Sequence, residues 1–257
     1  MSDELNLPAL NRQITELVLT GSTEHAEAAL DEVADQRGDL AIVEILETLS
    51  PEVACMHLSA FDGGKLSLAT LLISPASWAQ SLAYFAAIWR REDIEDEPEI
   101  LSESLYAHIH GVLFASDDQD RRAALIHEAL LTDWGTTAFA TLFSTAIGEI
   151  VELANEIHAR GAQNSGTTSS DHDIIPLALA VARTDVDAWD RVLLELFPDW
   201  QPGDNELHAR PEEEDEQYGY EYASPRNTQE LLTRLRSQVP SKATSNLRAT
   251  LGEDIFS

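Results

Sequence analysis

Lysine and cysteine are almost absent from this chain of 257 residues. Lys65 and Lys242 are the only lysines, and Cys55 is the single cysteine. One cysteine excludes an internal disulfide and any metal site built from several thiolates. Cys55 lies in an apolar helical pattern, and His57, two positions on, points away from it on a helix. We therefore predict a buried, unreactive thiol.

Glycine and proline are also scarce, at 12 and 10 residues, which is too few for a protein dense in strands and turns. Alanine, leucine and glutamate dominate instead, and they favour helices. The longest weakly polar stretch, residues 75–89, falls short of the roughly 20 residues that span a bilayer. The acidic N-terminus lacks the positive charge that begins a secretion signal. We expect a soluble, cytoplasmic protein.

Negative charge is present in excess. The chain has 46 acidic and 16 basic residues, a formal net charge of −30. Such a charge disfavours nucleic acid and anionic membranes as ligands of the body and favours basic protein partners. Solubility, or adaptation to high salt, would also explain it. The basic residues gather near the C-terminus, where the last 32 positions hold Arg226, Arg234, Arg236, Lys242 and Arg248.

Apolar residues recur at helical spacing through the first 200 residues. Ser50-Pro51 and Ser74-Pro75 each place a capping hydroxyl before a proline at the first helical position. We count about nine helices joined by short turns, with a charged break at 90–99 and one long helix over 135–160. The prediction is an all-α fold, either an irregular helical bundle or a short α-solenoid of antiparallel helices.

One helix should form the centre of the core. Residues 75–89 place Trp78, Leu82, Phe85 and Trp89 on one face, with alanines around them. Because an aromatic stripe at helical spacing is usually core, we interpret it as a packing face and not as a cofactor site.

The composition divides the chain into three parts. Residues 1–200 form an acidic all-helical body, with a mobile loop at about 161–173. Residues 201–226 form an acidic linker that contains tyrosines. Residues 227–257 form a mildly basic tail with one short amphipathic helix.

The linker and the tail supply the candidate partner-binding residues. Three tyrosines follow a run of acids, and aromatic anchors with an acidic approach suit docking to a basic groove, although the strip could also lie back on the body. The tail helix could dock on its own body or on a neighbouring copy, or grip a nucleic acid or an acidic partner. The candidates are Tyr218, Tyr220, Tyr222, Arg226, Leu231, Leu232, Arg234, Leu235 and Arg236.

Signals for catalysis and metal binding are weak. The Glu-x-x-His pattern of di-iron bundles is missing, and His108 and His110 point to opposite sides of a helix. A metal-dependent hydrolase would have to use His108, His172, Asp173 and Asp185. Glu149, Glu152 and Glu156 share a helix face that we expect to be solvated. We expect no cofactor and no resident metal.

Three functional hypotheses remain. The leading one is a non-catalytic adaptor or assembly factor that binds a protein with a basic surface and is able to self-associate through its tail. The second is an inhibitor that mimics nucleic acid with the acidic stretches 92–103 and 204–221. The third is the metal-dependent hydrolase.

Overall fold

A computed structural model describes residues 7–60, 67–166, 174–200, 207 and 223–240. These residues form helices and no β-strand, which confirms the all-α prediction. The elements are α1 (Leu7–Leu19), α2 (Thr23–Arg37), α3 (Asp39–Thr48), α4 (Pro51–Ser59), α5 (Leu68–Leu72), α6 (Pro75–Leu82), η1 (Phe85–Ala87), α7 (Arg91–Asp96), α8 (Pro98–Leu113), α9 (Gln119–Leu130), α10 (Asp133–Phe143), η2 (Ser144–Ala146), α11 (Ile147–Arg160), α12 (Ile174–Thr184), α13 (Val186–Leu196) and α14 (Thr228–Ser237).

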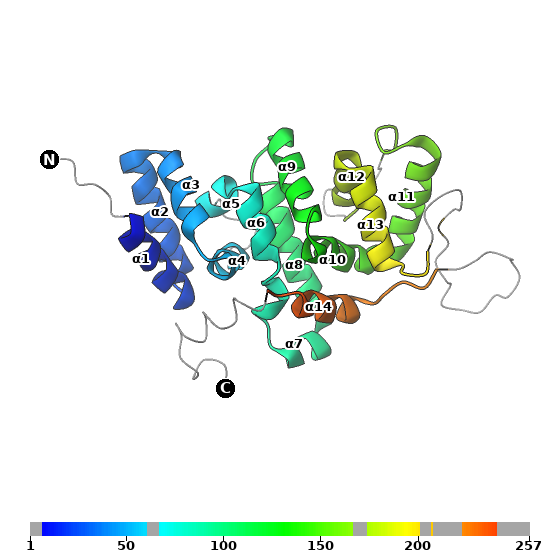
Figure 1. Ribbon diagram of the computed structural model, residues 1–257, viewed down its shortest axis with the longest axis horizontal. Coiled ribbons are helices and arrows are strands. Elements are labelled where there is room, and N and C mark those ends of the chain that lie inside the picture. The colour runs from blue at the N-terminus through cyan, green and yellow to red at the C-terminus, as the bar shows by residue number, and fades with distance from the viewer. Residues whose placement is uncertain (1–6, 61–66, 167–173, 201–206, 208–222, 241–257) are drawn as a thin grey trace, which may run out of the picture.

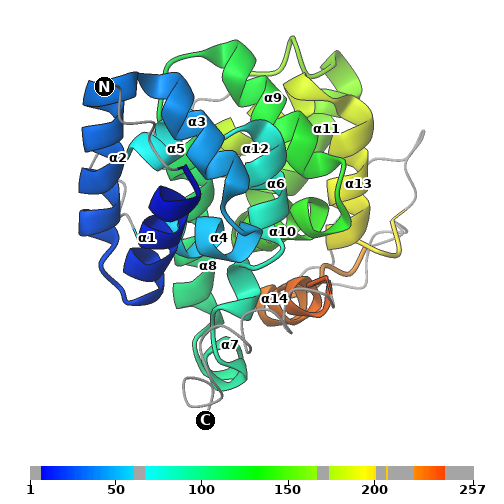
Figure 2. The same ribbon diagram turned by 60° about the vertical axis from the view of Figure 1, so that its left-hand side comes forward.

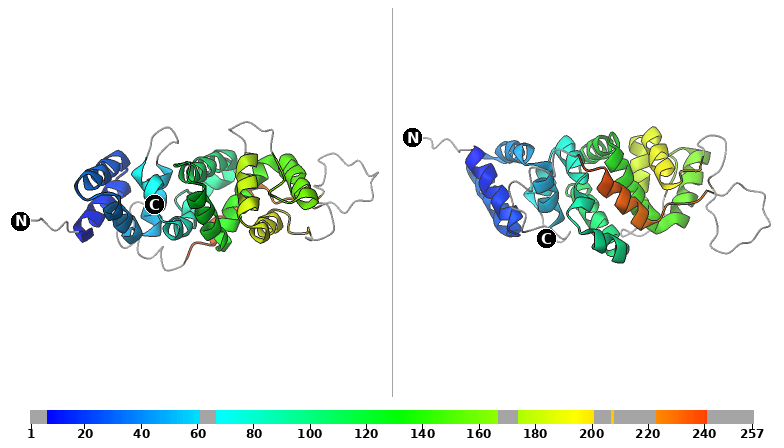
Figure 3. Two further views of the ribbon diagram at one scale, coloured as in Figure 1. Left: turned by 90° about the horizontal axis from the view of Figure 1, so that it is seen from above. Right: turned by 60° about the horizontal axis from the view of Figure 1, so that its bottom comes forward.

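The helices follow one another along the long axis of the molecule. Helices α1 to α3 lie at one end, α4 to α10 form the middle, and α11 to α13 lie at the other end (Figure 1). The view from above shows the same order (Figure 3). The exception is α14, which returns from the far end and lies against α10, α8 and α7 in the middle of the molecule (Figures 1 and 2).

The chain forms more helices than the nine that its pattern predicts. Two short helices, α5 and α7, were not predicted, and the expected helix over 75–89 ends at Leu82 and continues only as the turn η1. The charged segment 90–99, predicted as a break, contains α7. Its Ile94 is buried, and the Arg90 amide hydrogen-bonds Asp93, so a short charged segment is held as a helix by one apolar anchor.

The expected long helix over 135–160 is divided by η2. At this point Ser144 Oγ donates to the Thr141 carbonyl at 2.7 Å, and Thr145 Oγ1 donates to the Leu142 carbonyl at 2.7 Å. Hydroxyl groups that bond to nearby carbonyls compete with the helical ladder. Ser144 Oγ also lies 2.9 Å from Thr228 Oγ1 of α14, so a tertiary contact is made at the interruption.

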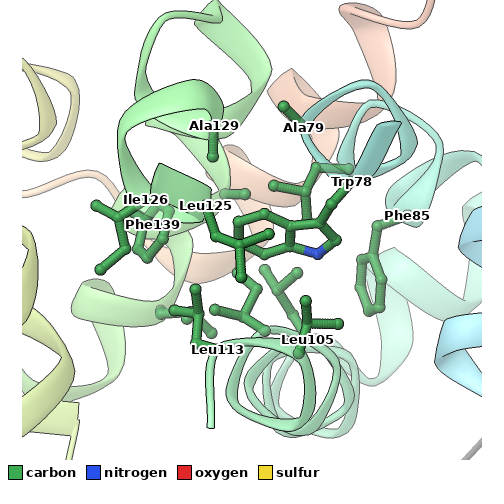
Figure 4. Close-up of a cluster of buried hydrophobic side chains, with 14 of the residues drawn as sticks. Trp78, Ala79, Phe85, Leu105, Leu113, Leu125, Ile126, Ala129 and Phe139 are labelled. Carbon is green, nitrogen blue, oxygen red and sulfur yellow. The ribbon is translucent and has the colours of Figure 1, made fainter. Parts of the chain in front are cut away.

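Helix α6 lies at the centre of the core, as predicted. Trp78, Leu82 and Phe85 are fully buried, and α6 packs against α9 and α4. Figure 4 shows the Trp78 indole surrounded by side chains of α8, α9 and α10. Trp89 is only partly buried and packs at the edge of this core. The Ser50 and Ser74 caps form as expected, each accepting a backbone amide at 3.3 Å.

One stretch of the described residues, Asp133–Arg160, is long and apolar enough to cross a membrane by length and composition alone. It comprises α10, η2 and α11, and all but one of the α10 side chains from Gly135 to Phe143 are buried in the protein. The stretch therefore also fits the core helix of a packed protein.

A buried carboxylate joins the first helices to α5. Glu27 of α2 accepts hydrogen bonds from His57 Nε2 at 2.7 Å, from Ser67 Oγ at 2.5 Å and from the Leu68 amide at 3.0 Å. Burial alone would raise the pKa of Glu27, but the hydrogen bonds from His57 and Ser67, the charge interaction with His57 and the Leu68 amide hold it below its ordinary value. Glu27 thus satisfies donors from two separate elements.

We expect Glu27→Ala to destabilise the protein by about 3 kcal/mol, because it leaves buried donors on α4 and α5 without an acceptor. Urea unfolding followed by circular dichroism measures the change. The control is Asp31→Ala, an exposed acid on the same helix, which should change stability by less than about 0.5 kcal/mol. Equal effects of the two substitutions would contradict the structural role of Glu27.

Candidate functional site

The predicted docking helix lies against the chain's own body. Leu231, Leu232 and Leu235 of α14 are fully buried in the same hydrophobic core as the helices of the first 200 residues. Asn227 caps the helix by accepting the Glu230 amide at 2.8 Å. The apolar face of α14 is therefore occupied within one chain, which corresponds to the first of the docking modes considered for it.

Glu195 of α13 is the main electrostatic anchor of α14. Its largely buried carboxylate pairs with Arg226 at 3.3 Å and with Arg234, and it accepts a hydrogen bond from Thr137 Oγ1 at 3.2 Å. Arg226 also donates to the Glu195 backbone carbonyl at 2.6 Å and pairs with the exposed Glu230 at 3.1 Å. One acid thus binds two of the three candidate arginines.

The third candidate, Arg236, donates to the backbone carbonyls of Ala86, at 3.1 Å, and Trp89 at the end of η1. All six candidate residues that the structure describes, one at the end of the linker and five in the tail, therefore contact the body of the chain. Tyr218, Tyr220 and Tyr222 lie outside the described residues, as do His172, Asp173 and most of the acidic stretch 204–221.

The expected mobile loop at 161–173 is only partly within the described residues. In 161–166, Ala162 and Ser165 are buried, and Arg183 donates to both of their carbonyls, at 3.2 and 2.8 Å. This first half of the loop is therefore held against α12, because one guanidinium satisfies its backbone.

Arginines bind backbone carbonyls at many places in the fold. A carbonyl group at the C-terminus of a helix has no intrahelical partner, and a guanidinium offers several donors to it. The acceptors are backbone carbonyls of α5, α8, α9, α13 and η1 and of the turn after α11. The donors are Arg121, Arg122, Arg183, Arg191, Arg226 and Arg236.

This use of arginine leaves the acids on the surface without balancing charge. One group of exposed acids lies on α7 and the first turns of α8 and is called the α7–α8 acidic surface. Its members are exposed and have no ion-pair partner among the described residues: Glu92, Asp96, Glu97, Glu99 and Glu103. Among the described residues, Arg90 and Arg91 form ion pairs in this segment, through exposed contacts with Asp93 and Glu95.

A groove of about 350 Å³ adjoins this surface and is called the α8 groove. It is lined by four residues of α8 and three from α10, η2 and α12: Glu99, Ser102, Glu103, Tyr106, Leu142, Thr145 and Ile174. Glu99 and Glu103 are four residues apart, so their carboxylates share one helix face and repel each other. The groove combines a partly apolar wall with two negative charges at its rim.

Two buried titratable groups, Cys55 of α4 and His108 of α8, are held in their neutral forms. Burial raises the pKa of Cys55 to about 12, opposed by its contact with Ser59 and assisted by Glu52. Burial lowers the pKa of His108 to about 4, and Ser59 Oγ lies 3.0 Å from His108 Nδ1. A protonated thiol and a weakly basic imidazole do not form an activated nucleophile. The prediction that Cys55 is buried is confirmed.

Metal ligands do not gather in the described part of the chain. Groups of three or more histidine, cysteine or acidic side chains that could hold an ion are missing there. Glu149 and Glu152 are exposed, and Glu156 pairs with Arg160 at 3.3 Å, which fits the predicted solvated face. His172 and Asp173, needed for the hydrolase hypothesis, are outside the described residues.

Comparison of the chain with protein-family models, with curated proteins and with solved structures found no match.

The sequence pattern indicates one part of this site and gives no sign of the other. The stretch 92–103 was singled out by its acids, and it contains Glu99 and Glu103. The apolar wall of the groove was missed, because Leu142, Thr145 and Ile174 come from elements remote in sequence. Only their packing around α8 brings them together.

We expect Glu195→Gln to loosen α14, because Arg226 and Arg234 lose their shared charge partner. The free energy for local opening of α14 should fall by about 1–3 kcal/mol, measured by amide hydrogen exchange over residues 228–237. The matched control is Glu230→Gln, which removes an exposed pair and should change exchange little. Equal exchange in the two variants would show that Glu195 does not anchor the helix.

Glu52 makes stability depend on pH. Burial raises its pKa to about 7 from an ordinary value of 4.5, so folding favours the protonated acid. Its contribution is fully present below pH 4.5 and is lost as the pH rises through about 7. Glu52→Gln should therefore match the parent near pH 4.5 and be the more stable protein above pH 7, in urea unfolding across that range. A constant difference at all pH values would contradict this assignment.

Proposed function

We propose that this chain is a non-catalytic protein-interaction adaptor or assembly factor that binds a basic segment of a partner through the α8 groove and the α7–α8 acidic surface. The observation that supports this most directly is the unbalanced charge of that surface. Five exposed carboxylates lie there without an ion-pair partner among the described residues. We interpret the ordered row of helices as a short α-solenoid in the cytoplasm.

The occupant we propose is a lysine- or arginine-rich segment that carries an apolar side chain. Its cations would relieve the repulsion between Glu99 and Glu103, which lie four residues apart on α8. Its apolar side chain would contact Leu142 and Ile174. Interfaces gain most of their binding free energy from an apolar or aromatic anchor, while charge sets orientation and the rate of association.

The C-terminal helix enters this proposal as a structural element of the body. Its leucines are buried against the helices that surround the groove, and α14 contacts both α7 and α8. Removal of residues 204–257 would therefore expose the core as well as delete candidate partner contacts. Surface substitutions test binding more cleanly than a truncation. The three tyrosines at 218, 220 and 222 stay a proposed second contact.

A fluorescent peptide provides the test. It should carry one phenylalanine between two pairs of lysines, and a second peptide should replace the phenylalanine with serine. We expect the first to bind at least about tenfold more tightly, because only it fills the apolar wall. Fluorescence anisotropy measures both affinities, which should fall as salt screens the charges.

Matched pairs of substitutions locate the binding surface. Glu99→Gln with Glu103→Gln should weaken binding of the phenylalanine peptide about tenfold or more. Glu149→Gln with Glu152→Gln changes the net charge equally on an exposed face outside the groove and should have an effect below about twofold. Equal losses in both double variants would mean that binding depends on diffuse charge and would reject the groove.

The nucleic-acid-mimic hypothesis uses the same acids but requires no apolar anchor. It predicts equal binding of the phenylalanine and serine peptides, together with displacement of duplex DNA from a basic DNA-binding protein at low salt. That combination of results would favour the mimic over the adaptor.

A further inference from the structure

A second cavity lies at the far end of the molecule, between α11, α13 and the segment that follows α13. Its volume is about 320 Å³, within the range of small-molecule sites. Its polar and aromatic lining comes from Asn155 and His158 of α11, from Trp189 and Asp190 of α13, and from Trp200. Aliphatic side chains, among them Leu207, form the rest of the wall.

The carboxylate in this cavity has no direct partner among the described residues. Asp190 is partly buried and has neither a hydrogen bond nor an ion pair among the described residues. Burial raises its pKa, the nearby charge of Asp187 raises it further, and only His158 acts in the opposite direction. A partly buried acid with no contacting cation among the described residues favours a positive group from outside as its partner.

The tryptophans add two further requirements. Trp189 and Trp200 supply indole rings to the wall, and an indole face is the best aromatic partner for an organic cation. The Trp200 Nε1 atom is buried and has no hydrogen-bond partner in the described structure. Trp78 and Trp89 also have Nε1 atoms in this state, but Trp200 is the one of the three that lines this cavity, where a ligand can supply the acceptor.

The wall of the cavity is fixed in place by an amide clamp. Asn155 Nδ2 donates to the Leu207 carbonyl at 2.9 Å, and Asn155 Oδ1 accepts the Leu207 amide at 2.8 Å. Leu207 is buried. This two-fold contact uses both polar atoms of Asn155 and leaves the side chains of Asp190, His158 and Trp200 as the polar groups of the cavity that face a ligand.

We propose that this cavity binds a small organic ammonium ion that also carries a hydrogen-bond acceptor, with Asp190 and the two indoles holding the cation and Trp200 Nε1 donating to the acceptor. A neutral apolar ligand would leave the Asp190 charge uncompensated. An anion would be repelled by Asp190 and by Asp187 nearby. A cation with an acceptor group would contact the Asp190 carboxylate, the indole rings and the Trp200 N–H at the same time.

The first experiment compares two probes of the same shape on the full chain. Choline carries a quaternary ammonium and a hydroxyl, and 3,3-dimethylbutan-1-ol replaces its nitrogen with carbon. Isothermal titration calorimetry should show saturable binding of choline with a Kd of about 1 mM or tighter. The neutral isostere should bind about tenfold more weakly or worse. Equal binding of the two probes, or no saturable binding of choline, would overturn the proposal.

Substitutions assign the roles of the residues. Asp190→Asn should weaken choline about tenfold or more while leaving the melting temperature unchanged or higher, because it removes an uncompensated charge. Glu152→Gln, an exposed acid on α11 outside the cavity, should bind choline like the parent. Parent-like binding by Asp190→Asn, in a variant that melts normally, would overturn the assignment.

Trp200→Phe tests the N–H separately from the ring. It should weaken choline by a larger factor than tetramethylammonium, because both ions lose the better aromatic face of the indole but only choline also loses the hydrogen bond from Nε1. Equal losses for both ions would reject the role of the N–H and leave Trp200 only its ring contact with the cation.

Discussion

The carbonyl groups at the C-terminal ends of helices are the constraint that organises this structure. Each helix leaves its last carbonyls without an intrahelical partner, and a stack of many short helices has many such ends. This chain meets several of them with arginine. Arg121 joins the ends of α5 and α8, Arg191 reaches the last carbonyl of α9, and Arg236 reaches the carbonyls at the end of η1. A guanidinium suits this task because it offers five donors in a fixed plane, whereas an ammonium is a compact point charge. The preference for arginine over lysine in this chain therefore matches the use of its cations as donors to backbone carbonyls.

The same constraint shapes the surface. The chain has 46 acids for 16 basic residues, and several of its arginines are directed at backbone carbonyls, so many exposed acids have no ion-pair partner among the described residues. On α7 and α8 these acids border a groove and support the proposal of a basic partner. Near α11 and α13 one partly buried acid lines a cavity with two tryptophans and supports the proposal of a small cation. The two proposed sites would use charge differently. At the exposed surface, charge would mainly affect the rate and orientation of binding, whereas at the partly buried acid it would add more to affinity, because water screens it less.

The features of the fold that depend on nearby residues could be predicted from the sequence, and those that depend on tertiary contacts could not. The buried face of Trp78, Leu82 and Phe85 and the capping serines at 50 and 74 follow from spacing and local hydrogen bonds, which nearby residues determine. The interruption at η2 and the helix α7 depend on other contacts. Ser144 contacts Thr228 of α14, which is 84 residues away in sequence. Ile94 is buried, so α7 depends on packing against the rest of the core. Of the candidate sites, the acids of 92–103 were visible as a run. Asp190 and Trp200 were not, because an isolated acid and an isolated tryptophan carry no signal until a cavity joins them.

The sequence by itself determined the helical class, the positions of the strongest helix starts, the buried state of Cys55 and the excess of negative charge. These properties depend on composition, on the 3.6-residue period and on hydrogen bonds within one turn. The tertiary structure alone decided that the arginine-containing helix α14 lies on its own body, with Glu195 holding Arg226 and Arg234. The physical reason is that an amphipathic helix must bury its leucines somewhere, and its sequence does not specify the surface. That choice depends on which apolar face the remaining helices leave open and on where a buried acid lies beside it.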